Sequence, residues 1–150
     1  MSKYSKGFTL IELIATMVIA SILASSLITG YRTYNEWLKV NEEILNMVNT
    51  LRQARDYCIE ANENFYLTVD TGADTYTLKY KDSKAALNLP GQNDNVFTMP
   101  SFVDFTASTG ITDLKFNILG EPSATETITI NTDERTIEIV YPTGYIYAHN

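Results

Sequence analysis

The 150-residue sequence contains one cysteine and one histidine, and both shortages restrict its chemistry. Cys58 cannot form a disulfide within the chain, because there is no second cysteine to pair with. His149 lies next to the C-terminus without another histidine or cysteine nearby, which excludes a zinc site of the usual ligand set. A lone cysteine in a helical stretch is most often a small buried apolar residue, and we expect this role for Cys58.

Basic residues are also scarce, with 11 lysines and arginines against 18 acidic residues and a net charge of −7. A surface of this sign repels the phosphates of nucleic acids. After Lys115 the only basic side chain apart from His149 is Arg135, and Asp133 and Glu134 directly precede it. We therefore expect no nucleic acid among the partners of the chain.

The usual signatures of a catalytic or metal site are missing as well. There is no Gly-rich phosphate loop and no evident pair of nucleophile and base. Asp70 and Asp74 fall in one turn, but the ordered oxygen ligands of a calcium loop do not follow them. The sequence thus predicts that the chain is not an enzyme. It also predicts no catalytic residue, no metal, no cofactor and no small-molecule substrate. Acid–base chemistry by a pair of carboxylates is the one alternative that stays open.

Charge is absent from Leu13 to Tyr31, a stretch rich in Ile, Leu, Ala, Val and Met. Roughly 20 such residues span a bilayer as a helix. Lys3 and Lys6 precede the stretch, and by the positive-inside rule they hold the N-terminus in the cytoplasm. The remainder of the chain is then expected outside.

Three interpretations of this segment compete. A cleavable secretory signal peptide has a shorter apolar core and no carboxylate within it, so it fits poorly. A plain signal anchor explains everything except Gly7-Phe8 and Glu12. In the third interpretation the chain is cut before the apolar run and keeps that run as its new N-terminus.

The stretch Gly7-Phe8-Thr9-Leu10-Ile11-Glu12-Leu13 resembles the class III signal of type IV pilins and pseudopilins. The resemblance implies that prepilin peptidase cleaves between Gly7 and Phe8 and methylates the new N-terminal Phe8. Glu12 becomes the fifth residue of the mature chain, where the family's glutamate is thought to pair with the N-terminal amine of a neighbouring subunit. Loss of a leader that holds Lys3 and Lys6 moves the net charge from −7 to −9.

The physical chemistry of Glu12 agrees with this resemblance. An ionisable residue in a membrane span is costly and usually has a partner. Cleavage would create an α-amino cation on Phe8, about one helical turn from Glu12. Because a buried charge is tolerable when it is paired, we expect Glu12 to set the register between adjacent helices during assembly.

Helical periodicity continues beyond the apolar run. No proline occurs before Pro90, so one helix is expected from about Thr9 to about Ala61, roughly 80 Å long, with Gly30 as the expected position of a bend. Apolar residues at three- and four-residue spacing predict one stripe that packs on a sheet. The stripe comprises Tyr34, Trp37/Leu38, Ile44/Leu45, Val48, Leu51, Ala54, Tyr57/Cys58 and Ala61.

The hydrophobic period then changes from about 3.6 to 2. A hairpin is predicted from Phe65–Val69 and Tyr76–Tyr80, and Lys81–Gln92 reads as a loop. Val96–Phe105 is broken by Pro100 and is expected to be an edge strand or an irregular crossing. Further strands are predicted at Leu114–Leu119, Thr127–Ile130, Thr136–Tyr141 and Tyr145–Ala148, with turns at Gly120–Pro122, Asn131–Glu134 and Pro142–Gly144.

The order of these elements extends the resemblance to one group within the pilin-like proteins. The helix end at Leu51–Asn62, the hairpin after it and the later strands resemble GspH/FimT-type minor pseudopilins. The positions that carry this resemblance are Phe116, Gly120, Ile128, Ile137, Ile139 and Gly144. Major pseudopilins, with a smaller head and a calcium-binding loop near the end, fit less well.

These observations predict an α+β chain whose long N-terminal helix is transmembrane in its first half and packs by its second half against antiparallel β-sheets. Its expected segments are a cleaved leader (1–7), a transmembrane and filament-core helix (8–30), an amphipathic continuation (31–62) and a β-rich head (63–150). The resemblance implies a minor pilin or pseudopilin, single-pass in the bacterial inner membrane, that joins other pilins in a pilus-like filament, at or near its tip. Type II secretion, type IV pili and competence systems all stay open, and a DNA- or surface-binding minor pilin is the alternative.

Overall fold

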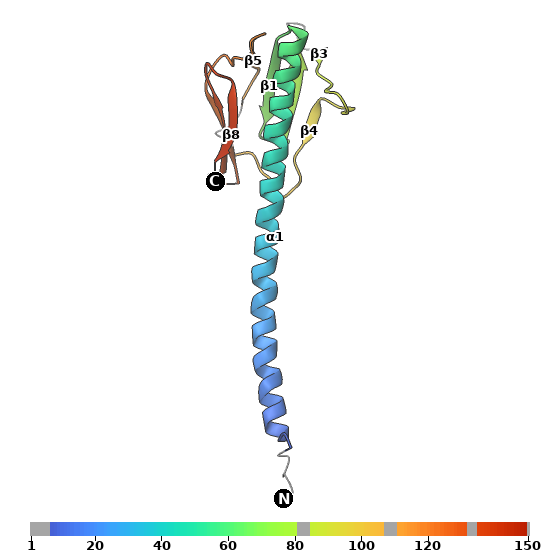
Figure 1. Ribbon diagram of the computed structural model, residues 1–150, viewed down its shortest axis with the longest axis vertical. Coiled ribbons are helices and arrows are strands. Elements are labelled where there is room, and N and C mark those ends of the chain that lie inside the picture. Colours follow the sequence, from blue (N-terminus) through green and yellow to red (C-terminus); the bar gives the residue numbers. More distant parts are fainter. Residues whose placement is uncertain (1–6, 81–84, 107–110, 132–134, 150) are drawn as a thin grey trace, which may run out of the picture. The chain divides into compact units, whose positions relative to one another are not determined.

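The computed structural model describes residues 7–80, 85–106, 111–131 and 135–149. Within them one helix precedes all the strands (Figure 1). Two compact units share the chain, residues 1–39 and 40–150, and their boundary falls inside the helix. The elements are α1 (Leu10–Ala61), β1 (Phe65–Asp70), β2 (Thr75–Tyr80), β3 (Ala85–Ala86), β4 (Val96–Thr98), β5 (Leu114–Phe116), β6 (Glu126–Ile130), β7 (Arg135–Val140) and β8 (Tyr145–His149).

The second half of α1 supplies one side of the hydrophobic core of residues 40–150. Its buried residues are Val40, Ile44, Met47, Val48, Leu51, Ala54 and Cys58. They share one cluster with inward-facing side chains of all the longer strands, among them Phe65, Leu78 and Ile137. The α+β architecture, with a long N-terminal helix packed on antiparallel sheets, is confirmed.

The predicted apolar stripe is wrong at its beginning. Tyr34, Trp37 and Leu38 are exposed, and the buried face starts only at Val40. Leu45, Tyr57 and Ala61 are exposed as well, while Met47, outside the predicted stripe, is buried. Periodicity predicts which face of a helix is apolar, but it does not show at which residue the covering sheet begins.

The strands form two antiparallel sheets within the described residues. The first has the order β3-β2-β1-β5, and β4 also pairs with β2. The second has the order β6-β7-β8. In β1 alternate residues are buried, namely Phe65, Leu67 and Val69, because successive side chains of a strand point to opposite faces.

The hairpin and the later strands occur where the sequence predicts them. In the hairpin, Phe65 pairs with Tyr80 and Asp70 with Thr75. The strand expected at Leu114–Leu119 ends earlier, at Phe116, because the Asn117 side chain forms a turn: its Oδ1 accepts hydrogen bonds from the amides of Leu119 and Glu121 at 2.9 and 3.0 Å.

Both expectations for Val96–Phe105 hold in part. β4 is a short strand at the side of β2, and an irregular segment follows it up to a single bridge between Phe105 and Ile130. The expected loop at Lys81–Gln92 contains the two-residue strand β3, and residues 81–84 lie outside the described part. The turn at Asn131–Glu134 likewise falls mostly on residues outside it.

Two glycines, Gly120 and Gly144, lie against each other in the interior. Both have positive φ angles, +77° and +64°, which side chains rarely adopt. A Cβ on Gly144 would overlap with the carbonyl oxygen of Gly120. The other positions that carry the narrower resemblance, Phe116, Ile128, Ile137 and Ile139, are fully buried, so this pattern describes the packing of the head.

Two arginines on α1 bind the chain around β8. Arg52 donates from Nε to the carbonyl of Ile146 at 2.9 Å, and Arg55 donates from Nη1 to the carbonyl of Gly144 at 2.7 Å. The Arg52 guanidinium also lies 5.8 Å from the ring centre of Tyr145. Hydrogen bonds from a charged donor are stronger than neutral ones, so the two side chains fix β8 to the helix.

Candidate functional site

Gly7 and Phe8 precede the first helical residue and are exposed. A Cβ on Gly7 would meet no atom within 4 Å, and the φ angle of Gly7 is outside the left-handed range. The fold of the chain itself therefore gives no reason for glycine at this position. Phe8 is 78% exposed, so its ring has no packing role in the chain either.

Glu12 forms a capping box with Thr9 at the beginning of α1. The Thr9 hydroxyl accepts a hydrogen bond from the Glu12 amide at 3.3 Å, and Glu12 Oε2 accepts from the Thr9 amide and the Thr9 hydroxyl, both at 2.9 Å. Such a box satisfies two of the amides that a helix leaves without partners at its start. The sequence signal for this box is Thr9-x-x-Glu12, and it gives Glu12 a role at the helix start in addition to the expected role in assembly.

The stretch after the capping box has the properties of a membrane span. By length and composition α1 could cross a membrane, with a window of mean hydropathy 2.2 in which no residue is buried. Its hydroxyl side chains donate to carbonyls three or four residues earlier, which satisfies them without water. These residues are Thr16, Ser21, Ser25, Ser26, Thr29 and Thr33.

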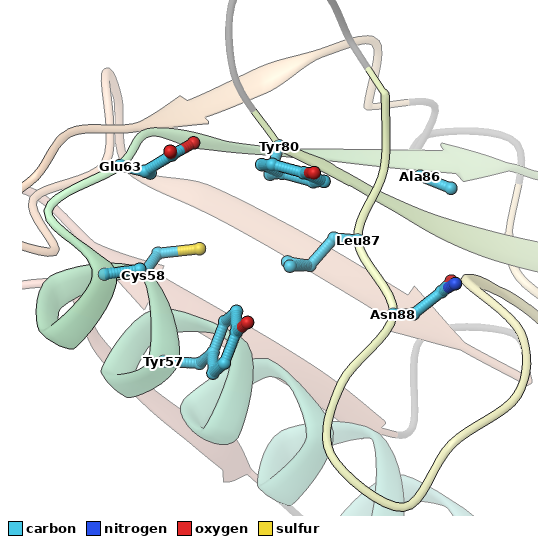
Figure 2. Close-up of a pocket in the computed structure, with 8 residues that line it drawn as sticks. Tyr57, Cys58, Glu63, Tyr80, Ala86, Leu87 and Asn88 are labelled. Atoms are coloured by element: carbon cyan, nitrogen blue, oxygen red, sulfur yellow. The ribbon is translucent and has the colours of Figure 1, made fainter.

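In the head, Cys58 lines a pocket of about 340 Å³ together with Tyr57, Glu63 and Tyr80 (Figure 2). The residue is 1% exposed. Burial, and secondarily the charge of Glu63, raises the pKa of the Cys58 thiol to about 11. Because the thiolate is the reactive form, this cysteine is not a nucleophile at neutral pH. It is the small buried apolar residue that the sequence predicts.

Asp70 and Asp74 have structural roles in the head. Oδ1 of Asp70 accepts from the amides of Gly72 and Ala73, at 2.9 and 3.2 Å, and so forms the hairpin turn. Oδ1 of Asp74 accepts from the Phe105 amide at 3.0 Å. Among the described residues no group of three or more His, Cys, Asp or Glu side chains could hold a metal ion.

Arg135, the last arginine or lysine of the chain, begins β7 and is only 8% exposed. A residue this deeply buried has little surface to offer to a phosphate backbone. Asp133 and Glu134 lie outside the described residues. The location of Arg135 thus adds a structural argument to the acidic net charge against capture of nucleic acid.

The comparisons with known proteins concern the two features just described, the N-terminal segment and the fold. Residues 2–28 match the family model for the prokaryotic N-terminal methylation motif. The crystal structure of the type IV minor pilin FimU from Pseudomonas aeruginosa (strain PAO1) superposes with a TM-score of 0.59 and 12% sequence identity. The match covers 78% of this chain and 92% of the FimU chain. No curated protein sequence matches the chain.

An N-terminal methylation motif on a chain with the type IV pilin fold defines a pilin-like protein. At 12% identity the likeness to FimU shows the fold alone. The narrower prediction of a GspH/FimT-type minor pseudopilin stays a prediction.

Proposed function

We propose that this chain is a minor pilin or pseudopilin subunit, which prepilin peptidase cleaves between Gly7 and Phe8 and methylates on Phe8. The observation that carries the proposal is the methylation motif at residues 2–28 on a chain with a pilin fold. Residues 1–7 are the leader, and residues 8–30 first anchor the subunit and then form filament core. Its partners are the peptidase and other pilins.

The proposed location is the bacterial inner membrane, crossed once, with the N-terminus in the cytoplasm and the head outside. Lys3 and Lys6 before the apolar run support this orientation. From the membrane the subunit enters a pilus-like filament, at or near its tip. Type II secretion, type IV pilus and competence machines remain equal candidates.

The local structure around Gly7 supports cleavage there. Gly7 and Phe8 are exposed and outside the helix, and peptidases act most readily on exposed, non-helical chain. Since the fold does not need glycine at position 7, a requirement for glycine would come from the cleft of the peptidase. A bulky side chain would obstruct that cleft.

Co-expression with a prepilin peptidase, followed by mass spectrometry of the N-terminus, tests the cleavage. The unaltered chain is expected to begin with N-methylated Phe8, and Gly7→Leu is expected to keep its leader. Gly30→Leu is the matched control, because Gly30 also has no atom within 4 Å of its Cβ position. It should be processed normally. Normal processing of Gly7→Leu would count against the proposed signal.

Glu12 has room for a second partner in addition to Thr9. Both hydrogen bonds that its carboxylate accepts within the described chain end on Oε2, so Oε1 can accept from a donor outside the chain. The methylated amine of Phe8 in a neighbouring subunit is the proposed donor. The capping box holds the carboxylate at the helix start, where such an amine would arrive.

Two substitutions at Glu12 separate its capping role from its charge. Glu12→Gln keeps a side-chain acceptor for the capping box but removes the charge. Glu12→Val removes both and should still insert into the membrane. We expect both variants to be processed and both to fail in assembly, because loss of a buried ionic partner costs about 3–5 kcal/mol. Filament recovery by shearing and immunoblot measures this. If Glu12→Gln assembles like the unaltered chain, capping alone explains Glu12.

A further inference from the structure

The aromatic residues of the N-terminal unit lie only at the ends of its apolar run. Phe8 precedes the run, and no aromatic residue occurs from Thr9 to Gly30. Then Tyr31, Tyr34 and Trp37 follow within seven residues. Their exposed fractions are 66%, 58% and 44%, and the rings of Tyr34 and Trp37 stack with centroids 6.2 Å apart. This distribution follows the boundary of the apolar run and not the packing of a core.

The positions of these aromatic residues along the helix can be compared with the thickness of a bilayer. Glu12 and Arg32 are the charged residues that bound the uncharged stretch, and they are twenty residues apart. At 1.5 Å per residue this separation is about 30 Å, the thickness of the hydrocarbon core of a typical bilayer. Tyr31 then lies at the outer edge of the hydrocarbon, and the backbone of Trp37 about 7.5 Å beyond Arg32, at the outer margin of the headgroup layer.

The aromatic side chains also share one side of the helix. At about 100° per residue, Tyr31, Tyr34 and Trp37 fall within a stripe about 120° wide. Arg32 and Lys39 fall on the other side. A surface with rings on one side and cations on the other suits the headgroup layer, where rings meet the glycerol region and cations meet phosphates.

We propose that Tyr31, Tyr34 and Trp37 form an interfacial anchor in the outer headgroup layer of the inner membrane. Its partner is the phospholipid headgroup region, which accommodates rings with one apolar body and one polar group. The proposal rests on the membrane anchoring in the proposed function and adds the depth of the helix. The anchor holds Glu12 at the inner edge of the hydrocarbon, where its carboxylate can reach water before assembly.

The anchor also has a consequence for assembly. A subunit that leaves the bilayer for a filament must withdraw these rings from the headgroup layer. Weakening the anchor should therefore make it easier for the subunit to leave the bilayer. It should also make the depth of the helix in the membrane less well defined.

Trp37 is the only tryptophan in the chain, so its fluorescence reports on the anchor without labelling. The full-length protein is reconstituted, at low protein density, in vesicles of phosphatidylethanolamine with one quarter phosphatidylglycerol. Resistance to alkaline extraction establishes insertion independently. Quenchers are then placed either at the headgroup or at the middle of the acyl chains. We expect blue-shifted emission and quenching about twofold stronger from the headgroup position than from mid-bilayer.

A matched pair of variants tests the contribution of the aromatic cluster. Tyr34→Ala removes the ring that stacks on Trp37, and we expect Trp37 to become more accessible to aqueous iodide. Tyr57→Ala, an exposed tyrosine much further along α1, should leave the quenching unchanged.

The possible results of these experiments distinguish failure of the interfacial anchor from failure of the membrane anchoring on which it rests. Loss of the protein on alkaline extraction would contradict the membrane anchoring. An inserted protein whose Trp37 has water-like emission, or is quenched most strongly from mid-bilayer, would overturn the interfacial anchor alone. Shielding of Trp37 that disappears on further dilution in lipid would assign the surface to a second copy of the chain and also overturn it.

Discussion

Replacing Gly144 by alanine should strongly destabilise the head. The Cβ of the new residue would overlap with the carbonyl oxygen of Gly120, which belongs to the backbone of another turn and cannot rotate away. The same Cβ would lie 3.4 Å from Cδ of Arg55, whose guanidinium binds the Gly144 carbonyl. The substitution thus disturbs the turn before β8, the turn after β5 and an arginine that connects β8 to α1.

The expected cost has two parts. A non-glycine residue at the φ of +64° costs about 1–2 kcal/mol, and the overlap with a packed neighbour adds about 1–3 kcal/mol. The total is about 2–5 kcal/mol. For a head of this size that loss lowers the melting temperature by about 8–20 °C.

Thermal unfolding of the full-length protein in detergent, followed by circular dichroism, measures this loss. Gly72→Ala is the matched control, because Gly72 lies in the hairpin turn with ordinary φ and only a 3.4 Å contact to Oδ1 of Asp70. It should change the free energy of unfolding by less than about 1 kcal/mol. A melting temperature for Gly144→Ala equal to that of the control would refute the packing argument.

Two further predictions concern the core of the head. Leu51→Ala, at a residue with no exposed surface, should cost about 2–5 kcal/mol of unfolding free energy, whereas Leu45→Ala at a 49% exposed position should cost less than about 1, as chemical denaturation would measure. Cys58 should resist alkylation at pH 8 in the folded protein and react fully after denaturation; rapid alkylation of the native chain would contradict its burial. Its pKa is raised from 9.0 to about 11, so the folded state favours the neutral thiol. The stability contributed by that preference is present below about pH 9 and is lost as pH rises through about 11, which pH-dependent melting would show.

Local patterns were sufficient to predict most of the elements of this fold. The absence of proline before Pro90 and the apolar periodicity predicted the helix to within one residue of its observed start. Alternation between turn residues located the hairpin and the later strands. These features depend on residues that are neighbours along the chain, so a single sequence is enough to predict them.

Contacts between distant residues could not be predicted in the same way. The close approach of Gly144 to Gly120 and the bond from Arg52 to Ile146 join residues that are far apart along the chain. The first buried residue of the helix, Val40, depends on where the sheet begins and not on the helix itself. At the N-terminus, the capping box of Thr9 and Glu12 is a local Thr-x-x-Glu pattern, whereas the uncharged run beside Glu12 indicates only membrane burial.

The arginine bonds to the carbonyls of Gly144 and Ile146 have a consequence for how copies of this chain associate. β8 is an edge strand of its sheet, and an unprotected edge is a template on which a strand from another molecule can pair. Carbonyls that already accept from Arg52 and Arg55 are poor acceptors for such an incoming strand. The outer edge of β8 is thereby protected from pairing with a strand of another molecule, which disfavours sheet-to-sheet aggregation of the heads.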